Sequence, residues 1–213
     1  VEVIPNAIDP GDFLPSRSLE EVRGELGLPV TAPVVALVGR MTEQKGHTYL
    51  LRALPALAGR HPGLHLIIAG DGPLRSALEA EAKALGVHHR CHFLGVRQDV
   101  ADLLAASDVV AVPSLSEGLP YVILEAMAVA RPVVASRVSG NPEVVAEGLT
   151  GLLVPPKDVG ALTSALDRVL SDPEIATALG AEGRRRVESE FTLERMLAGV
   201  EKVYRSCLEE VHP

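Results

Sequence analysis

The chain has 213 residues, with 20 Lys and Arg against 28 Asp and Glu, which gives a formal net charge of -8. That length favours a single domain, which we expect to cover residues 1–213. The acidic balance disfavours nucleic-acid binding, and an aromatic content of 3% without Trp disfavours base-stacking surfaces. No run approaches the roughly 18 apolar residues of a membrane span. We therefore expect a cytoplasmic protein, with peripheral membrane attachment of a longer natural protein left open.

After a lead-in over residues 1–15, short apolar runs alternate with helix-length segments. Such runs are typical of strands covered on both faces. They are Val34–Val38, Leu64–Ala69, Cys91–Leu94, Val109–Val112, Val133–Ala135 and Leu152–Val154. The expected helices are Gly46–Gly59, Pro73–Leu85, Gln98–Ala106, Pro120–Ala130 and a segment capped by Asp158. This order predicts an α/β fold, a doubly wound, Rossmann-like parallel sheet with helices on both faces.

The last forty residues depart from this alternation, with two consecutive helical patterns, Pro173–Val187 and Leu193–Glu210. The second pattern carries an apolar stripe. Two interpretations of residues 188–213 stay open: the helix packs on its own domain, or it also contacts a domain that is missing here. The two cysteines, Cys91 and Cys207, lie in apolar stretches and are expected to be buried.

Open parallel sheets bind ligands at the carboxyl ends of their strands. After the first run comes Gly39-Arg40, with Lys45 and Gly46 five positions further on, so two cations flank a turn that feeds a helix. They can converge on one anion, or they can be solvated loop charges. After the second run comes Gly70-Asp71-Gly72, which begins like a dinucleotide fingerprint but has Arg75 in place of the third glycine.

The fourth run is followed by the strongest signal, two carboxylates around the start of a helix. Glu117 precedes that helix and Glu125 lies in its second turn. Backbone amides at a helix start can cradle an anion, here those of Gly118, Leu119, Tyr121 and Val122. A carboxylate can accept hydrogen bonds from two vicinal hydroxyls, or backbone amides of the chain itself can satisfy it. With no Asp-x-Asp pair and no Cys/His cluster, we expect no metal.

These motifs resemble the family-four (group 1) retaining glycosyltransferases. Glu117 and Glu125, followed by Ala126-Met127-Ala128, resemble that family's E-x7-E signature. Further motifs occur in the same order along the chain: Gly39-Arg40 with Lys45-Gly46, Gly70–Pro73, the opening hinge segment Val3–Asp9, Ser139–Val145 and Gly151–Val154. The resemblance covers nearly the whole chain, although Ser139 and Ala7 stand where the family often has Gly.

The resemblance implies the C-terminal, donor-binding half of a GT-B architecture, whose donor is a nucleoside-diphosphate-sugar and whose mechanism needs no metal. Arg40 and Lys45 would neutralise the diphosphate, and Glu117 would contact the transferred sugar; these three are the expected catalytic residues. Glu125 would hold the ribose hydroxyls. The remaining expected donor-binding residues are Gly39, Gly70, Asp71, Phe93, Leu94, Gly95, Val96, Gly118, Leu119, Pro120, Tyr121 and Val122.

A glycan, lipid or small-molecule acceptor would bind through a missing N-terminal domain, so we expect this chain to be inactive alone. Two alternatives stay open. One is a nucleotide-sugar-binding module that works with a separate partner chain, and the other is a sugar-nucleotide epimerase of related architecture. A nicotinamide oxidoreductase is disfavoured by the missing third glycine at Arg75.

Overall fold

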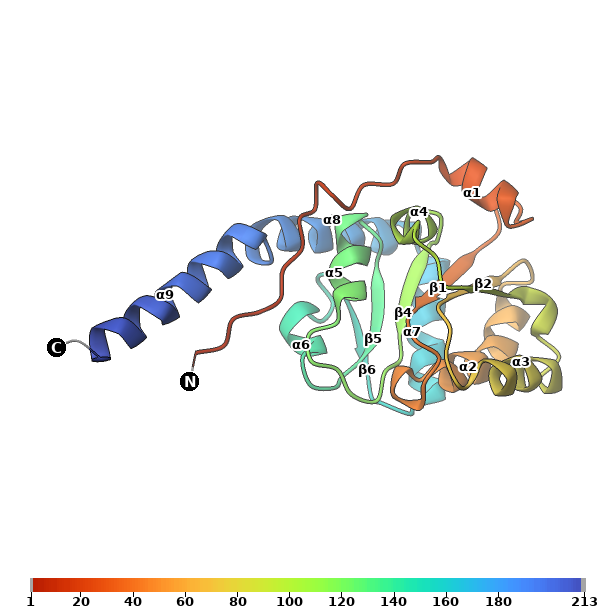
Figure 1. Ribbon diagram of the computed structural model, residues 1–213. Helices are drawn as coiled ribbons and strands as arrows, with labels where there is room; N and C mark the ends of the chain where they lie inside the picture. The colour runs from red at the N-terminus through yellow and green to blue at the C-terminus, as the bar shows by residue number, and fades with distance from the viewer. Residues whose placement is uncertain (1, 212–213) are drawn as a thin grey trace.

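The computed structural model describes residues 2–211 and the side chains of residues 2–208, so residue 1 and residues 212–213 of the expected domain lie outside it. A single sheet forms the centre (Figure 1). Its strands are β1 (Val34–Val38), β2 (His65–Ala69), β3 (Cys91–Gly95), β4 (Val109–Val112), β5 (Val133–Ser136) and β6 (Gly151–Val154). Their order is β3-β2-β1-β4-β5-β6, and every pairing is parallel. The predicted doubly wound α/β fold is therefore confirmed.

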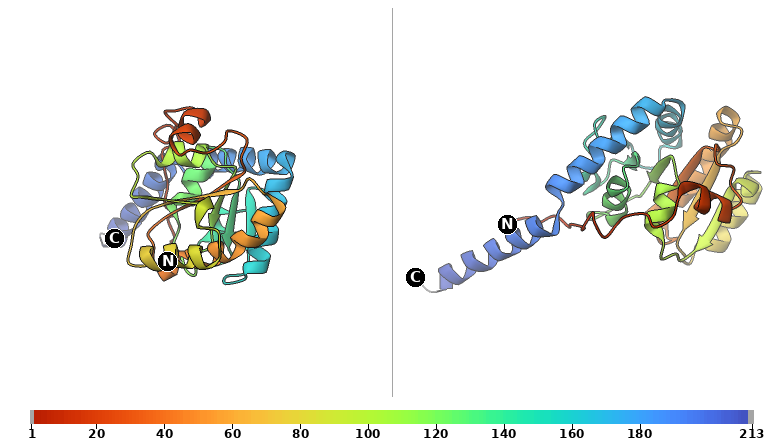
Figure 2. Two further views of the ribbon diagram at one scale, coloured as in Figure 1. Left: turned by 90° about the vertical axis from the view of Figure 1, so that its right-hand side faces the viewer. Right: turned by 90° about the horizontal axis from the view of Figure 1, so that it is seen from above.

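Helices cover both faces of the sheet, because alternate strand residues point to opposite sides. On one face α2 (His47–Arg60), α3 (Arg75–Ala84) and α7 (Val159–Ser171) pack on residues such as Val35 and Leu66. On the other face α4 (Val100–Ala105) and α5 (Tyr121–Ala128) pack on residues such as Val34 and Ile67. The helix α8 (Pro173–Glu190) lies against α5 and α7 (Figure 2).

The structure differs from the sequence prediction at several helix ends. It adds α1 (Leu19–Glu25), α6 (Asn141–Val144) and the 3-10 turns η1 (Glu43–Lys45) and η2 (His88–Arg90). These elements are too short to show a hydrophobic period. Two of the three helices expected to open on proline begin later, because Pro73 lies in a turn before α3 and Pro120 is the N-cap of α5. The third, α8, begins at Pro173 as predicted.

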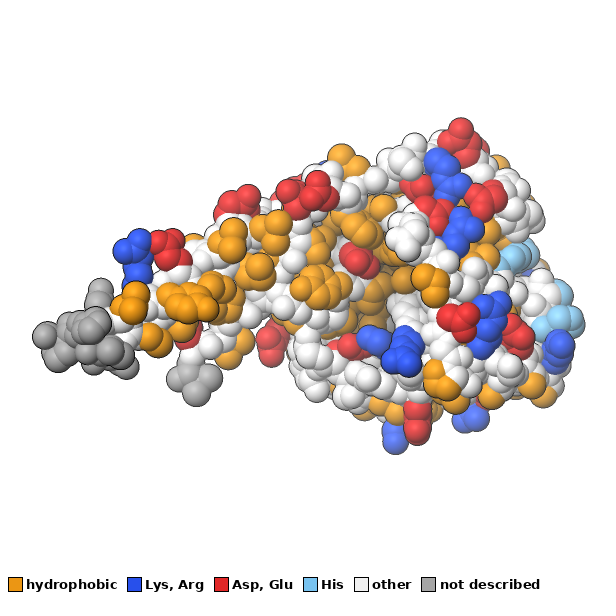
Figure 3. All heavy atoms as spheres, viewed as in Figure 1, with side chains coloured by type: hydrophobic (Ala, Val, Ile, Leu, Met, Phe, Trp, Pro, Cys, Tyr) orange, Lys and Arg blue, Asp and Glu red, His pale blue; other side chains and the backbone are white. Residues whose placement is uncertain are grey.

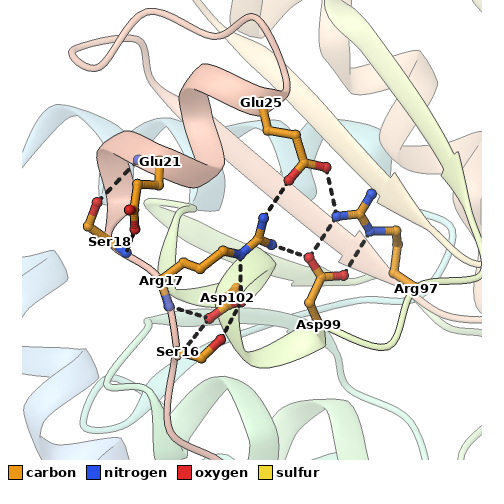
Figure 4. A network of polar contacts seen from close by, with 8 residues as sticks. All are labelled: Ser16, Arg17, Ser18, Glu21, Glu25, Arg97, Asp99 and Asp102. Atoms are coloured by element: carbon orange, nitrogen blue, oxygen red, sulfur yellow. Dashed lines mark hydrogen bonds and ion pairs between the residues drawn. The ribbon is translucent and has the colours of Figure 1, made fainter.

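A network of charged side chains fixes the segment before α1 to α4 (Figure 4). Arg17 pairs with Asp99, Asp102 and Glu25, and Arg97 pairs with Asp99 and Glu25. Burial pushes the pKa of Asp102 upward, but the hydrogen bonds from Arg17 and Ser16 outweigh it together and hold that pKa below its usual value. The network lies beside the loop that follows β3, so it positions that loop at the carboxyl edge of the sheet.

The last helix, α9 (Leu193–Val211), extends away from the sheet, and the start of the chain runs beside it (Figures 1 and 2). Ile4 lies against Gly199, and Glu2 pairs with Lys202. Apolar side chains gather along this helix (Figure 3). Leu197, Tyr204 and Leu208 are 60%, 69% and 63% exposed, so their own domain does not cover them.

The expectation of two buried cysteines is wrong for one of them. Cys91 is half-buried, and burial raises the pKa of its thiol to about 12. Cys207 is exposed, because it lies near the end of α9, which extends away from the body of the domain (Figure 1). None of the described helices is long and apolar enough to cross a bilayer.

Arg23 in α1 provides a test of how firmly this helix is attached. Its side chain is 2% exposed, donates to the carbonyls of Ala106, Val30 and Ala32, and pairs with Asp108. We expect Arg23→Ala to lower the free energy of unfolding by about 3–5 kcal/mol. The substitution leaves the Asp108 carboxylate without its cation and the buried carbonyl oxygens of Ala106 and Ala32 without their donor.

The control is Arg184→Ala, which removes an exposed pair with Glu188 within one helix and should cost about 0.5 kcal/mol or less. Urea denaturation of both variants measures the difference. Equal losses would contradict the structural role assigned to Arg23.

Candidate functional site

The carboxyl ends of β1 and β4 meet at the centre of the sheet. These strands are neighbours, yet the chain leaves β1 toward α2 on one face and leaves β4 toward α5 on the other. Such a reversal opens a crevice at the sheet edge, where ligands of doubly wound folds bind. The loops over residues 39–46 and 113–120 lie at this edge.

Gly46 brings the two loops into contact. Its φ is 69°, in the left-handed region that favours glycine, and a Cβ atom there would lie 2.0 Å from the carbonyl oxygen of Pro113. The Leu115 amide donates to the Gln44 carbonyl across 2.7 Å, which joins the loops a second time. A larger residue at position 46 would separate them.

An ion pair crosses the same contact. Lys45 Nζ lies 2.7 Å from Glu117 Oε1, and the Ser114 hydroxyl donates to that oxygen across 2.6 Å. The Glu117 side chain is only 6% exposed. Both charged residues are predicted from the sequence, but their pairing and the role of the buried Ser114 are not. A small polar residue directly after an apolar run, three positions before Glu117, was the available signal.

A groove lies next to this pair, along the carboxyl ends of β1 and β2. Five of the predicted site residues line it together with Val38, Ala69, Arg97 and Val100; they are Gly39, Arg40, Gly70, Asp71 and Val96. Val38 also lines a smaller recess that contains Lys45, Glu117 and Val122, so groove and recess are adjacent. Arg40 is exposed and forms no hydrogen bond or ion pair with any described side chain.

In the predicted stretch 93–96, three other expected donor-binding residues, Phe93, Leu94 and Gly95, do not line the groove. Phe93 and Leu94 pack against the apolar core on opposite faces of the sheet. The Gly95 carbonyl accepts a hydrogen bond of 2.7 Å from the Gly70 amide, which fixes the rim. Only Val96 of this stretch lines the groove, because β3 alternates its side chains between the two helix layers.

The start of α5 offers donors and one carboxylate. Within the described residues, the amides of Gly118, Leu119, Tyr121 and Val122 donate no hydrogen bond to the chain. Glu125 is half-buried in the second turn, its side chain has no described partner, and burial raises its pKa. A desolvated carboxylate of this kind is suited to accept hydrogen bonds from hydroxyl groups of a ligand.

His47, directly after Gly46, is 2% exposed and its two ring nitrogens are buried without a described partner. Burial, with a smaller effect from the charge of Lys45, lowers its pKa to about 4.

Within residues 2–208, no group of three or more His, Cys, Asp and Glu side chains is arranged to hold a metal ion. The edge therefore offers cations and amides for an anion, and carboxylates for hydroxyls.

The model of the family described as glycosyl transferases group 1 matches residues 18–186, so the chain belongs to this family. The GDP-mannose-dependent monoacylated alpha-(1-6)-phosphatidylinositol monomannoside mannosyltransferase of Corynebacterium glutamicum is 36% identical, over 92% of this chain and 53% of that protein. The chain spans about half the length of the curated relatives it matches.

Among solved structures, Anabaena HepE in complex with UDP superposes with a TM-score of 0.89 at 28% identity, over 96% of this chain and 57% of that one. The C-terminal domain of a glycosyl transferase group 1 family protein from Francisella tularensis has a TM-score of 0.78 at 23% identity. The superposition covers 87% of this chain and 99% of that domain, and it shows a likeness of fold. The fold is thus the C-terminal half of a GT-B architecture.

The depressed pKa of His47 predicts how stability depends on pH. Between pH 6.5 and about 4 the unfolded chain binds a proton at this position that the folded chain does not, so stability falls as pH drops through this window. We expect His47→Leu to make the free energy of unfolding less dependent on pH there.

The control for this prediction is His88→Gln, at an exposed histidine. Urea denaturation at pH 7, 6 and 5 gives the slope of the free energy of unfolding against pH for each protein. A slope for His47→Leu that equals those of the control and of the parent chain would contradict the prediction.

Proposed function

We propose that this chain binds a nucleoside-diphosphate-sugar as the donor of a retaining, metal-independent glycosyl transfer. The observation that supports this proposal most strongly is the placement of Arg40 and Lys45 beside the free amides of α5 and the carboxylates Glu117 and Glu125. This arrangement combines a site for a diphosphate with sites for sugar hydroxyls. Family membership and the likeness to a UDP complex add to it.

In the proposed mechanism, Arg40 and Lys45 carry the charge of the diphosphate. Negative charge on the leaving phosphate grows during transfer, and fixed cations and amides stabilise it most in the transition state. The amides of Gly118, Leu119, Tyr121 and Val122 supply the second group of donors.

Glu117 and Glu125 would contact the two sugars of the donor, which are the transferred sugar and the ribose. Glu125, whose carboxylate has no described partner, accepts hydrogen bonds from the ribose hydroxyls. Glu117, already oriented by Lys45 and Ser114, contacts the transferred sugar and stabilises positive charge at its anomeric carbon. The nucleobase would lie in the groove beside Val96.

The acceptor would be held by polypeptide outside this chain, since the chain spans about half of its relatives. The exposed side chains of α9, among them Leu197 and Tyr204, fit contact with that part. A separate partner chain would satisfy the same geometry, so the natural length of the protein distinguishes these two forms of the proposal.

A panel of UDP, GDP and ADP tests the proposal. We expect at least one to raise the melting temperature of the 213-residue chain, and to do so in excess EDTA. No stabilisation by any of them would contradict donor binding. Stabilisation lost in EDTA and restored by Mn²⁺ would contradict metal independence. Sugar transfer to acceptors by this chain alone would contradict the assignment to the donor side.

The two cations give a sharper test. Arg40→Ala and Lys45→Ala should each weaken nucleoside-diphosphate binding by about 1.5–3 kcal/mol, the scale of charged hydrogen bonds. Lys83→Ala, at an exposed lysine in α3, is the control and should leave binding unchanged. Calorimetry measures all three affinities. Unchanged binding in both site variants would refute the assignment.

A further inference from the structure

The side chain of Asn6 connects the start of the chain to the loop before α5. Its Nδ2 donates a hydrogen bond to the carbonyl oxygen of Leu119 across 3.2 Å, between residues 113 positions apart. We call residues 117–120 the donor loop and keep the name hinge segment for residues 3–9. The proposed function uses the donor loop but gives no role to Asn6.

The donor loop is supported on its other side by the turn before α6. A Cβ atom at Gly140 would lie 1.6 Å from the carbonyl oxygen of Gly118, so the two backbones are in close contact. Pro120 is buried at the end of the loop, whereas Gly118 is exposed. The loop is therefore held between a rigid backbone contact and the amide of Asn6, while its outer face stays open.

The hinge segment has its own fixed points. The Ile8 amide donates to the Phe191 carbonyl across 3.1 Å, at the junction of α8 and α9. Near the start of the segment, Glu2 pairs with Lys202 across 2.8 Å. Figure 1 shows the segment passing that junction on its way to the body of the domain.

Between these fixed points the hinge segment covers a hollow. Pro5, Asn6 and Ala7 line a cavity of about 640 Å³, and Glu143 and Arg186 also line it. Within residues 2–208, no other hydrogen bond joins the hinge segment to the donor loop. A shift of the hinge segment therefore reaches the hydrogen bonding of the donor loop through this amide.

We propose that Asn6 is a positioning residue that holds the donor loop in its binding shape and thereby couples donor affinity to the position of the hinge segment. This inference rests on the proposed function. Coupling of two sites is reciprocal, so donor binding would in turn restrict the hinge segment. Any polypeptide attached before the hinge segment could then change donor affinity without touching the donor.

Hydrogen exchange without nucleotide tests the coupling itself. Asn6→Ala removes the side-chain amide, and Asn6→Asp keeps its shape but lacks the N–H donor. We expect two amides that donate to carbonyls of the donor loop, those of Ile123 to Pro120 and of Gly140 to Glu117, to exchange about threefold to tenfold faster in both variants. This is the scale of one lost neutral hydrogen bond. Val3→Ala is the control, at a position of the same segment that is 74% exposed. Exchange equal to that of the parent chain in either Asn6 variant would overturn the proposal.

Titration with UDP, GDP or ADP, whichever stabilises the parent chain, tests the consequence for binding. We expect the dissociation constant to rise about threefold to tenfold in both Asn6 variants and to stay unchanged in Val3→Ala. Melting temperatures of the free proteins show whether folding is intact. Unchanged affinity in Asn6→Asp would overturn the coupling. A parent chain that binds no nucleotide would instead refute the proposed function, while the exchange result still decides whether Asn6 holds the loop.

Discussion

The parallel pairing of β1 with β4 is the constraint on which the candidate site depends. The chain departs from these neighbouring strands toward opposite faces, so their carboxyl ends carry loops that diverge above one crevice. A close backbone contact, Gly46 against the Pro113 carbonyl, and the hydrogen bond from the Leu115 amide to the Gln44 carbonyl bring the loops together. The pairing of Lys45 with Glu117 follows from that contact, because the two residues lie 72 positions apart in sequence.

The site is also defined by polar groups that the chain leaves without partners. Arg40 is exposed without an ion pair to any described residue, and Glu125 is desolvated without a described hydrogen bond. A desolvated carboxylate without a partner, such as Glu125, lowers stability in the free protein. Arg40 and Glu125 follow neighbouring strands at the edge where the chain turns to opposite faces, as do the amides of Tyr121 and Val122. A ligand with an anionic part and hydroxyl groups would satisfy all of them together.

Sequence alone predicted the sheet well, because strands buried on both faces read as unbroken apolar runs, and each predicted run contains or overlaps an observed strand. Short elements were missed, since the seven residues of α1 form only about two turns, too few for a repeating apolar pattern to stand out. The capping box of Ser18 and Glu21 was the available signal for this helix. The position of Arg40 and Glu117 shortly after two apolar runs predicted that both lie at the carboxyl edge of the sheet, as the structure shows. The bonds of Ser114 and Asn6 were beyond prediction, because each depends on distances that only the packed fold sets.

Lys45 would be shared between two anions in the proposed complex. In the free chain it neutralises the buried Glu117, a carboxylate that would otherwise be costly in so dry a position. A diphosphate arriving beside Lys45 weakens that pairing, since one ammonium then divides its charge. Ser114 donates to Glu117 independently of Lys45, so this hydrogen bond would keep the carboxylate oriented while its negative charge becomes less compensated. Donor binding itself would thus strengthen the field that Glu117 directs at the transferred sugar.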